Sequence, residues 1–268
     1  MSRLYYKEYG HGDPILLIHG FGAHSYTWRY IVPGLAHCYR VIVVDLKGVG
    51  RSEKSLDNKY SIHDQACLVI DLIKRLRLNN LTLVGNSYGG GVALAVIIEL
   101  LERKEDLISK LILIDSMGYP QRLPLFIKLL RIPFAGNIFV NTLPVSLQVK
   151  YILKLAYYDD EKIRDEDITA YAQFLRTSLE RNALLSTARQ IVPDDIDSFL
   201  VKYPEIKIPT LIIWGEFDEI IPVSIGELLN NSLPNSQLHI IEDCGHIPQE
   251  ERPKETLELI EDFLTLEH

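Results

Sequence analysis

Short apolar runs alternate with longer amphipathic stretches through the first 118 residues of the chain. Unbroken apolar runs of four to six residues are typical of strands that are buried on both faces of a parallel sheet. We therefore predict strands at residues 14–19, 41–44, 81–84 and 111–114. Residues 61–76 and 88–102 have apolar side chains at helical spacing instead, and we predict helices there.

The pattern changes at residue 119. From there to about residue 206 we find no convincing strand, only helical spacing interrupted by prolines. Within this segment we predict helices at residues 123–130, 145–157, 168–175 and 182–191. Strands then resume at 210–214 and 237–241, with helices at 224–229 and 253–264. This predicts one α/β core domain, formed by residues 1–118 and 207–268, that is interrupted by a helical cap at residues 119–206.

Composition excludes several classes of protein. The 268 residues include 36 Asp and Glu against 28 Lys and Arg, so the net charge of −8 disfavours a basic nucleic-acid binder. Three cysteines, Cys38, Cys67 and Cys244, form neither a disulfide framework nor a zinc-binding spacing. Residues 1–10 do not resemble a signal peptide, and no apolar run approaches the roughly 18 residues that span a bilayer. We therefore expect a cytoplasmic protein without a nucleic-acid or membrane partner.

A short glycine-flanked motif carries the first candidate chemistry. Gly85-Asn86-Ser87-Tyr88-Gly89 stands between a predicted buried strand and a predicted helix. In this G-x-S-x-G setting the serine lies on a sharp, strained turn, and small residues two positions to either side let strand and helix approach each other. Ser87 is therefore predicted to be a nucleophile at the carboxyl edge of the sheet.

A serine hydroxyl needs a base, and the base needs a carboxylate that orients it. His246 follows the last predicted strand and Asp218 follows the strand before it, which is the chain order serine, acid, histidine that this fold requires. Glu216 and Glu219 are nearby alternatives for the acid. Asp115, after an earlier strand, is the main rival to Asp218.

An acyl-transfer site also needs two backbone N–H donors for the oxyanion. We predict one from Tyr88, the residue after the nucleophile, and the other from Phe21 in the turn His19-Gly20-Phe21-Gly22. The glycines let that backbone turn toward the site. His19 at the strand end is interpreted as a residue that fixes the loop through hydrogen bonds, not as a second base.

Other motifs do not support a cofactor or metal. Residues 48–52, Gly-Val-Gly-Arg-Ser, lack the third glycine of a dinucleotide fingerprint, and the chain has no Gly-Lys-Ser or Gly-Lys-Thr phosphate loop. No pair of histidines or cysteines has the spacing of metal ligands. We therefore predict no cofactor and no metal.

Together these motifs resemble the α/β-hydrolase family over residues 14–263. The matching segments are His19-Gly20-Phe21-Gly22, residues 45–52, Gly85-Asn86-Ser87-Tyr88-Gly89-Gly90, residues 214–218 and Gly245-His246. The resemblance implies an eight-stranded, mostly parallel sheet with helices on both faces. It also implies a helical cap inserted after the sixth strand, and a Ser87-His246-Asp218 triad under that cap.

The resemblance also narrows the reaction. Haloalkane dehalogenases and epoxide hydrolases of this shape use an aspartate nucleophile, so Ser87 disfavours both. Asn86 with Gly89-Gly90 is similar to the hydrolases that cleave a carbon–carbon bond in ring-cleavage products. Those enzymes usually have a tryptophan soon after the histidine, whereas Ile247-Pro248-Gln249 follows His246 here.

We therefore predict a serine hydrolase that cleaves carboxylic esters of small, largely apolar molecules through an acyl-enzyme. The alternatives are a carbon–carbon bond hydrolase of the 2-hydroxy-6-oxo-dienoate type and a ligand-sensing relative of such enzymes. The natural substrate and the oligomeric state, a homodimer included, are left open by the sequence.

Overall fold

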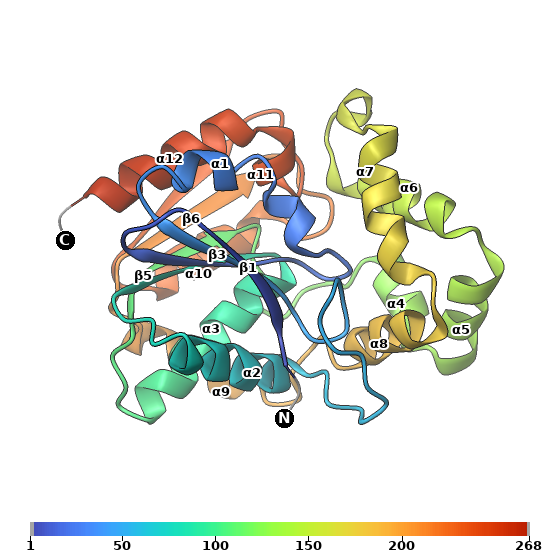
Figure 1. Cartoon of the computed structure of the whole chain (residues 1–268), viewed down its shortest axis with the longest axis horizontal. Helices are drawn as coiled ribbons and strands as arrows, with labels where there is room; N and C mark the ends of the chain where they lie inside the picture. Colours follow the sequence, from blue (N-terminus) through green and yellow to red (C-terminus); the bar gives the residue numbers. More distant parts are fainter. Residues whose placement is uncertain (1–2, 267–268) are drawn as a thin grey trace.

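A computed structural model of the chain describes residues 3–266, and a seven-stranded sheet lies at its centre (Figure 1). The strand order is β1-β3-β2-β4-β5-β6-β7. β1 runs antiparallel to β3, and every other neighbouring pair is parallel. The strands are β1 (Tyr5–Tyr9), β2 (Pro14–Ile18), β3 (Arg40–Asp45), β4 (Leu81–Asn86), β5 (Ile108–Ile114), β6 (Thr210–Gly215) and β7 (Ser236–Ile241).

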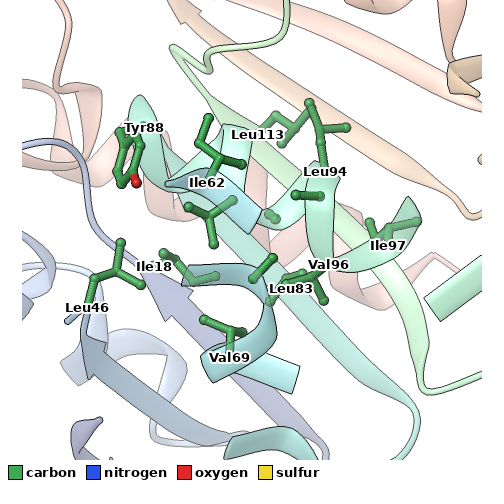
Figure 2. Packing of buried hydrophobic residues seen from close by; sticks show 14 of the residues in the cluster. Ile18, Leu46, Ile62, Val69, Leu83, Tyr88, Leu94, Val96, Ile97 and Leu113 are labelled. Atoms are coloured by element: carbon green, nitrogen blue, oxygen red, sulfur yellow. The ribbon is translucent and has the colours of Figure 1, made fainter. Parts of the chain in front are cut away.

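Alternating side chains of the strands build a core on each face of the sheet, as the period of two requires. In β2, Leu16 and Ile18 belong to one core cluster, whereas Ile15 and Leu17 belong to the other. The first cluster includes residues of α2 (Ile62–Arg75), α3 (Tyr88–Glu102) and α10 (Val223–Ser232). Figure 2 shows its tight packing around Ile18, Leu83 and Val69. The second includes residues of α1 (Val32–Leu35) and α12 (Pro253–Thr265).

Local sequence sets where the core helices begin. Ser61 caps α2 by accepting from the Asp64 N–H, while the Asp64 carboxylate accepts from the Ser61 N–H. This reciprocal pairing satisfies two backbone donors that a helix start leaves unpaired. α12 begins at Pro253, where a missing N–H costs nothing. A further short helix, α11 (Pro248–Glu251), follows β7, and the 3₁₀ turn η1 (Ser25–Trp28) follows β2.

Between β5 and β6 the described residues contain helices and no strand, as predicted. Helices α4 to α8 stand together beside the sheet-containing part of the molecule, whereas α9 lies next to α2 (Figure 1). Prolines mark the start of three of them, because α5 starts at Pro133 while Pro124 and Pro144 precede α4 and α6. The helices are α4 (Leu125–Arg131), α5 (Pro133–Thr142), α6 (Val145–Ala156), α7 (Asp165–Ala172), α8 (Ser178–Arg189) and α9 (Ile196–Leu200), with 3₁₀ turns η2 (Asp160–Lys162), η3 (Gln173–Leu175) and η4 (Tyr203–Glu205).

The α/β-hydrolase architecture is confirmed, but the number of strands differs from the eight expected. Residues 3–266 form seven, so the helical insertion follows the fifth of them. β1 and β7 are the two edges of the sheet, and no eighth strand pairs with either edge within the described residues. The domain bounds at residues 118–119 and 206–207 stay a prediction, and their outermost residues 1–2 and 267–268 lie outside the described residues.

The sequence pattern missed β1, because residues 1–10 are polar. Tyr5–Tyr9 is the edge strand of the sheet, and its last three residues, Lys7 to Tyr9, are exposed. Only a strand that is covered on both faces has the unbroken apolar run that we used to find the others.

Candidate active site

Ser87 occupies a strained turn between β4 and α3. Its φ of 56° and ψ of −122° lie outside the regions that non-glycine residues prefer. The flanking glycines make this turn feasible: a Cβ on Gly85 would lie 2.4 Å from the Gly89 carbonyl oxygen, and one on Gly89 would lie 2.5 Å from that of Ile18. The turn therefore presents the Ser87 hydroxyl at the carboxyl end of β4, at the N-terminus of α3.

The loops after β6 and β7 bring Asp218 and His246 to Ser87. His246 Nε2 lies 2.8 Å from Ser87 Oγ, and its Nδ1 lies 2.7 Å from Asp218 Oδ2. The other Asp218 oxygen accepts from the backbone N–H groups of Ile220 and Ile221, at 2.8 and 2.9 Å. Since the carboxylate accepts at Nδ1, that nitrogen carries the proton, which leaves Nε2 able to accept from the serine hydroxyl.

Of the other acids that the sequence left open, only Asp115 is close. It is fully buried, and Gly215 N–H donates to its Oδ1 at 2.9 Å. Its Oδ2 has no hydrogen-bond partner among the described residues. Oxygens of Asp115 and Asp218 and a nitrogen of His246 all lie within 4.8 Å of one another, as ligands of a cation would, but both nitrogens of His246 are engaged in hydrogen bonds. Glu216 and Glu219 are exposed and do not contact His246.

The pKa of the Asp115 carboxyl is raised well above its usual value, first because burial disfavours the charged form and second because Asp218 is negative. The raised pKa favours the protonated form of Asp115 in the folded protein. The neutral carboxyl beside Asp218 avoids placing two adjacent charges in the interior.

We expect Asp115→Asn to weaken the pH dependence of stability. In the unfolded chain an Asp loses its proton near pH 4, while the folded protein retains it, so the free energy of unfolding falls as pH rises through this window. The slope from this one group reaches about 1.4 kcal/mol per pH unit and ends above the raised pKa. Urea unfolding from pH 4 upward should give a flatter profile for Asp115→Asn than for wild type. The exposed control Glu219→Gln should keep the wild-type slope, and equal slopes for all three proteins would contradict the assignment.

His19 fixes the loop that follows β2. Its Nδ1 donates to the Gly20 carbonyl at 2.8 Å, and its Nε2 accepts from the Leu46 N–H at 2.9 Å, so it joins the loops after β2 and β3. Burial lowers the pKa of His19, which keeps the ring neutral in this arrangement. Gly22 in the same turn has a φ of +67°, a conformation that favours glycine.

The two backbone amides that we predict to bind the oxyanion belong to Phe21 and Tyr88. Within residues 3–266 neither the Phe21 nor the Tyr88 N–H donates to a protein acceptor. Gly20 lies close to the nucleophile, because a Cβ there would be 3.1 Å from Ser87 Cβ. The assignment of Phe21 and Tyr88 as oxyanion donors stays a prediction.

Asn86 ties three strand ends together. Its buried side-chain amide donates to the Ile114 carbonyl at 3.1 Å and to the His246 carbonyl at 3.3 Å. One side chain on β4 therefore contacts the end of β5 and the loop that carries His246. A residue noted in the sequence only as part of the serine motif thus also positions the histidine.

The cap fastens the histidine loop from the other side. The His246 backbone N–H donates to the carbonyl of Ala156, the last residue of α6, at 2.7 Å. The buried Glu251 carboxylate accepts from Gly245 N–H at 2.7 Å, from Tyr158 N–H at 3.1 Å and from Asp159 N–H at 2.8 Å. Core and cap therefore share one hydrogen-bonded junction next to His246.

Ser87 and His246 open into a cavity of roughly 160 Å³ between core and cap. Its wall is predominantly apolar, which makes it a site for apolar groups with few polar contacts. Representative apolar side chains are Phe126, Ile127 and Leu130 of α4, Phe139 of α5, and Val149, Ile152 and Leu153 of α6. The described lining residues include no Lys or Arg, and their one acidic residue is Glu250.

A buried ionic cluster supports one end of this cavity, and the sequence analysis missed it. Arg29 donates to Glu250 at 2.5 Å and to Asp167 of α7 at 2.8 Å, and Thr27 donates to Glu250 at 2.6 Å. The Tyr171 hydroxyl of α7 also donates to Glu250. No local motif reveals the cluster, because 138 and 221 residues separate Arg29 from its two partners.

Known proteins match the chain over nearly its whole length. The family model described as alpha/beta hydrolase fold matches residues 13–253. The uncharacterized hydrolase YugF of Bacillus subtilis is 31% identical, over 97% of this chain and 94% of its own. A 2-hydroxymuconate semialdehyde hydrolase of Pseudomonas sp. is 30% identical, over 95% and 88%. The structure of a thermophilic esterase from Thermogutta terrifontis is 27% identical with a TM-score of 0.80, over 98% and 93%.

These relatives include both an esterase and a 2-hydroxymuconate semialdehyde hydrolase, so they establish a hydrolase without resolving which class of hydrolase it is. The family model covers far more than half of the sequence, in agreement with the sheet order and the helical insertion. The chain therefore belongs to the α/β hydrolase fold family.

Proposed function

We propose that this protein hydrolyses carboxylic esters through a Ser87-His246-Asp218 triad. The observation that carries the proposal is the continuous chain of hydrogen bonds from Asp218 through His246 to Ser87, at 2.7 and 2.8 Å, beside an apolar cavity. A serine that donates to a neutral, oriented imidazole is the arrangement that makes a hydroxyl nucleophilic.

The reaction follows from these contacts in two halves. Ser87 Oγ bonds to the ester carbonyl carbon while its proton passes to His246 Nε2, and the carbonyl oxygen becomes an oxyanion at the Phe21 and Tyr88 amides. The intermediate collapses, the bond to the alcohol oxygen breaks, and His246 gives its proton to that oxygen. A water molecule then attacks the acyl-serine with His246 as the base, which releases the acid and restores the Ser87 hydroxyl.

Charges around the cavity favour a neutral substrate. The described lining has no cationic side chain. Arg29 of the buried cluster is not available to a substrate carboxylate, because it already pairs with Glu250 and Asp167. A substrate carboxylate that entered the apolar part would lose its hydration without gaining an ion pair, at a cost of several kcal/mol. We therefore propose esters with apolar acyl or aryl groups.

Carbon–carbon bond hydrolysis of a 2-hydroxy-6-oxo-dienoate is the second candidate. The similarity to 2-hydroxymuconate semialdehyde hydrolase supports it. A neighbouring cavity supports it as well, because Arg131 lines that cavity together with Met117, Gln121 and Leu123, which also line the first. A dienoate that reached across both cavities would place its carboxylate near a cation.

A side-by-side assay separates the two reactions. We expect kcat/KM for p-nitrophenyl butyrate to exceed that for a 2-hydroxy-6-oxo-dienoate by roughly 100-fold. This ratio reflects the free-energy cost of burying the dienoate carboxylate without an ion-pair partner. Ser87→Ala measured in parallel gives the background for both substrates. Faster turnover of the dienoate would reverse the ranking, and tight ligand binding without turnover of either substrate would favour a ligand-sensing protein.

A further inference from the structure

Helices α4, α5 and α6 carry exposed apolar side chains as well as the buried ones that line the cavity. On α4, α5 and α6 the inner side chains line the cavity, while large apolar side chains point to solvent. Phe134 is 85% exposed and Ile138, one turn later on α5, is 62% exposed. We call the exposed set the cap patch: Leu125, Ile132, Phe134, Ile138, Leu147 and Tyr151.

The segment that carries the cap patch is also basic, in an otherwise acidic protein. From Ser116 to Tyr158 the sequence has no Asp or Glu, although the whole chain has a net charge of −8. The basic residues of this stretch are Arg122, Lys128, Arg131, Lys150 and Lys154. Lys154 pairs with Asp160, whereas the other four have no ion-pair partner in the part of the chain that the structure describes. Lys128 and Lys150 are exposed on α4 and α6, the helices that also carry Leu125 and Leu147.

A surface of apolar side chains with unpaired cations among them is complementary to the surface of an anionic bilayer. Leucine, isoleucine and phenylalanine side chains enter the boundary between headgroups and acyl chains, and an aromatic ring with a polar tip, such as Tyr151, suits the headgroup level. Each nearby Lys or Arg adds about 1 kcal/mol of attraction to an anionic leaflet.

A second copy of the chain fits this face less well. A symmetric dimer through the cap patch would place the same basic helices opposite each other, and like charges across an interface are unfavourable. The basic side chains favour an anionic partner. The apolar side chains favour a partner that also has a hydrocarbon interior.

We propose that the cap patch docks the protein onto anionic membrane surfaces. No described helix is long and apolar enough to cross a bilayer, so the attachment is to the surface. The expectation of no membrane partner rested on the lack of a spanning segment, a criterion that does not detect a surface of this kind. If the proposed ester hydrolysis holds, docking brings the cavity within one helix layer of lipid-dissolved substrates.

Vesicle sedimentation tests the proposal without any turnover. Wild type should bind vesicles of phosphatidylcholine with one third phosphatidylglycerol at least tenfold more tightly than pure phosphatidylcholine vesicles. Phe134→Asp/Ile138→Asp should bind the anionic vesicles at least tenfold more weakly than wild type. The matched control is Leu56→Asp/Val201→Asp, which adds the same charge at positions that are 71% and 70% exposed and lie outside the patch. Its binding should stay within about threefold of wild type.

A second variant keeps the test independent of apolar-to-acid substitutions. Lys128→Gln/Lys150→Gln should lower binding to anionic vesicles roughly tenfold and leave binding to phosphatidylcholine unchanged. Circular dichroism and the rate of fluorophosphonate labelling show that each variant is folded. Because sedimentation measures binding and not turnover, its result does not depend on the proposed ester hydrolysis. Failure of wild type to bind anionic vesicles would overturn the proposal, as would equal losses in the control pair. A dimer that only Phe134→Asp/Ile138→Asp dissociates, without vesicle binding, would assign the surface to a second copy instead.

Discussion

Replacing Ser87 by alanine is expected to lower kcat for ester hydrolysis by roughly 10⁴- to 10⁶-fold. The change removes the atom that bonds to the carbonyl carbon, while the fold around it has room for the smaller side chain. His246 would then have only water to activate, so a residual rate from the oxyanion donors and the cavity should remain. Hydrolysis of p-nitrophenyl esters measures the loss, and intact-protein mass after fluorophosphonate treatment shows whether the nucleophile is gone.

Ser116→Ala is the matched control for this experiment. Ser116 is also a buried serine close to the strand ends, but its hydroxyl donates to the Met117 carbonyl and does not contact His246. We expect near wild-type turnover and full labelling of this variant. Wild-type activity in Ser87→Ala, or labelling that survives it, would show that another residue is the nucleophile.

The second large effect is expected for Asp218→Asn, which should lower kcat by about 10³- to 10⁴-fold. The backbone N–H groups of Ile220 and Ile221 both donate to Asp218 Oδ1, so the amide oxygen of an Asn must take that place. Its NH₂ group would then face His246 Nδ1 and donate to it. This stabilises the tautomer with the proton on Nε2, which cannot accept from Ser87.

Asp115→Asn provides the comparison for this prediction. Because burial and the charge of Asp218 raise the pKa of Asp115 and so favour its neutral form, the neutral amide should change kcat by no more than about threefold. The pair of variants therefore tests the choice of acid that the sequence left open. A collapse of activity in Asp115→Asn together with a mild effect of Asp218→Asn would move the acid to the end of β5.

The sequence predicts most of the sheet and the position of the serine because these features are local. An unbroken apolar run marks each strand from β2 to β6, and glycines two residues to either side of Ser87 mark its turn. Asp218 and His246 could be proposed because the chain order and the strand ends restrict the choices to a few residues. Which acid contacts the imidazole depends on the tertiary structure, because the loops after β5 and β6 both end near His246.

The features that the sequence does not reveal depend on contacts between residues far apart in the chain, or on which side chains become buried. β1 has no apolar run because the side chains of its last three residues are exposed. Arg29 meets Asp167 and Glu250 only through the tertiary structure. The raised pKa of Asp115 likewise requires the burial that the assembled sheet provides. The double-sided apolar character of α4 to α6 is visible in the sequence, but which side lines the cavity is decided by packing against the core.

The junction between Ala156, Glu251 and the histidine loop limits how this enzyme can be re-engineered. One way to change the shape of the pocket would be to exchange the whole insertion for one from a relative. This exchange would remove the carbonyl that accepts from the His246 N–H and the backbone amides that donate to Glu251. A chimera should therefore keep residues 156–159 of this chain, and also α7, whose Asp167 and Tyr171 hold the buried cluster around Glu250. Among the described residues, none from α4 to the start of α6 hydrogen-bonds to His246 or Glu251, so an exchange confined to that segment leaves the polar contacts of the base in place.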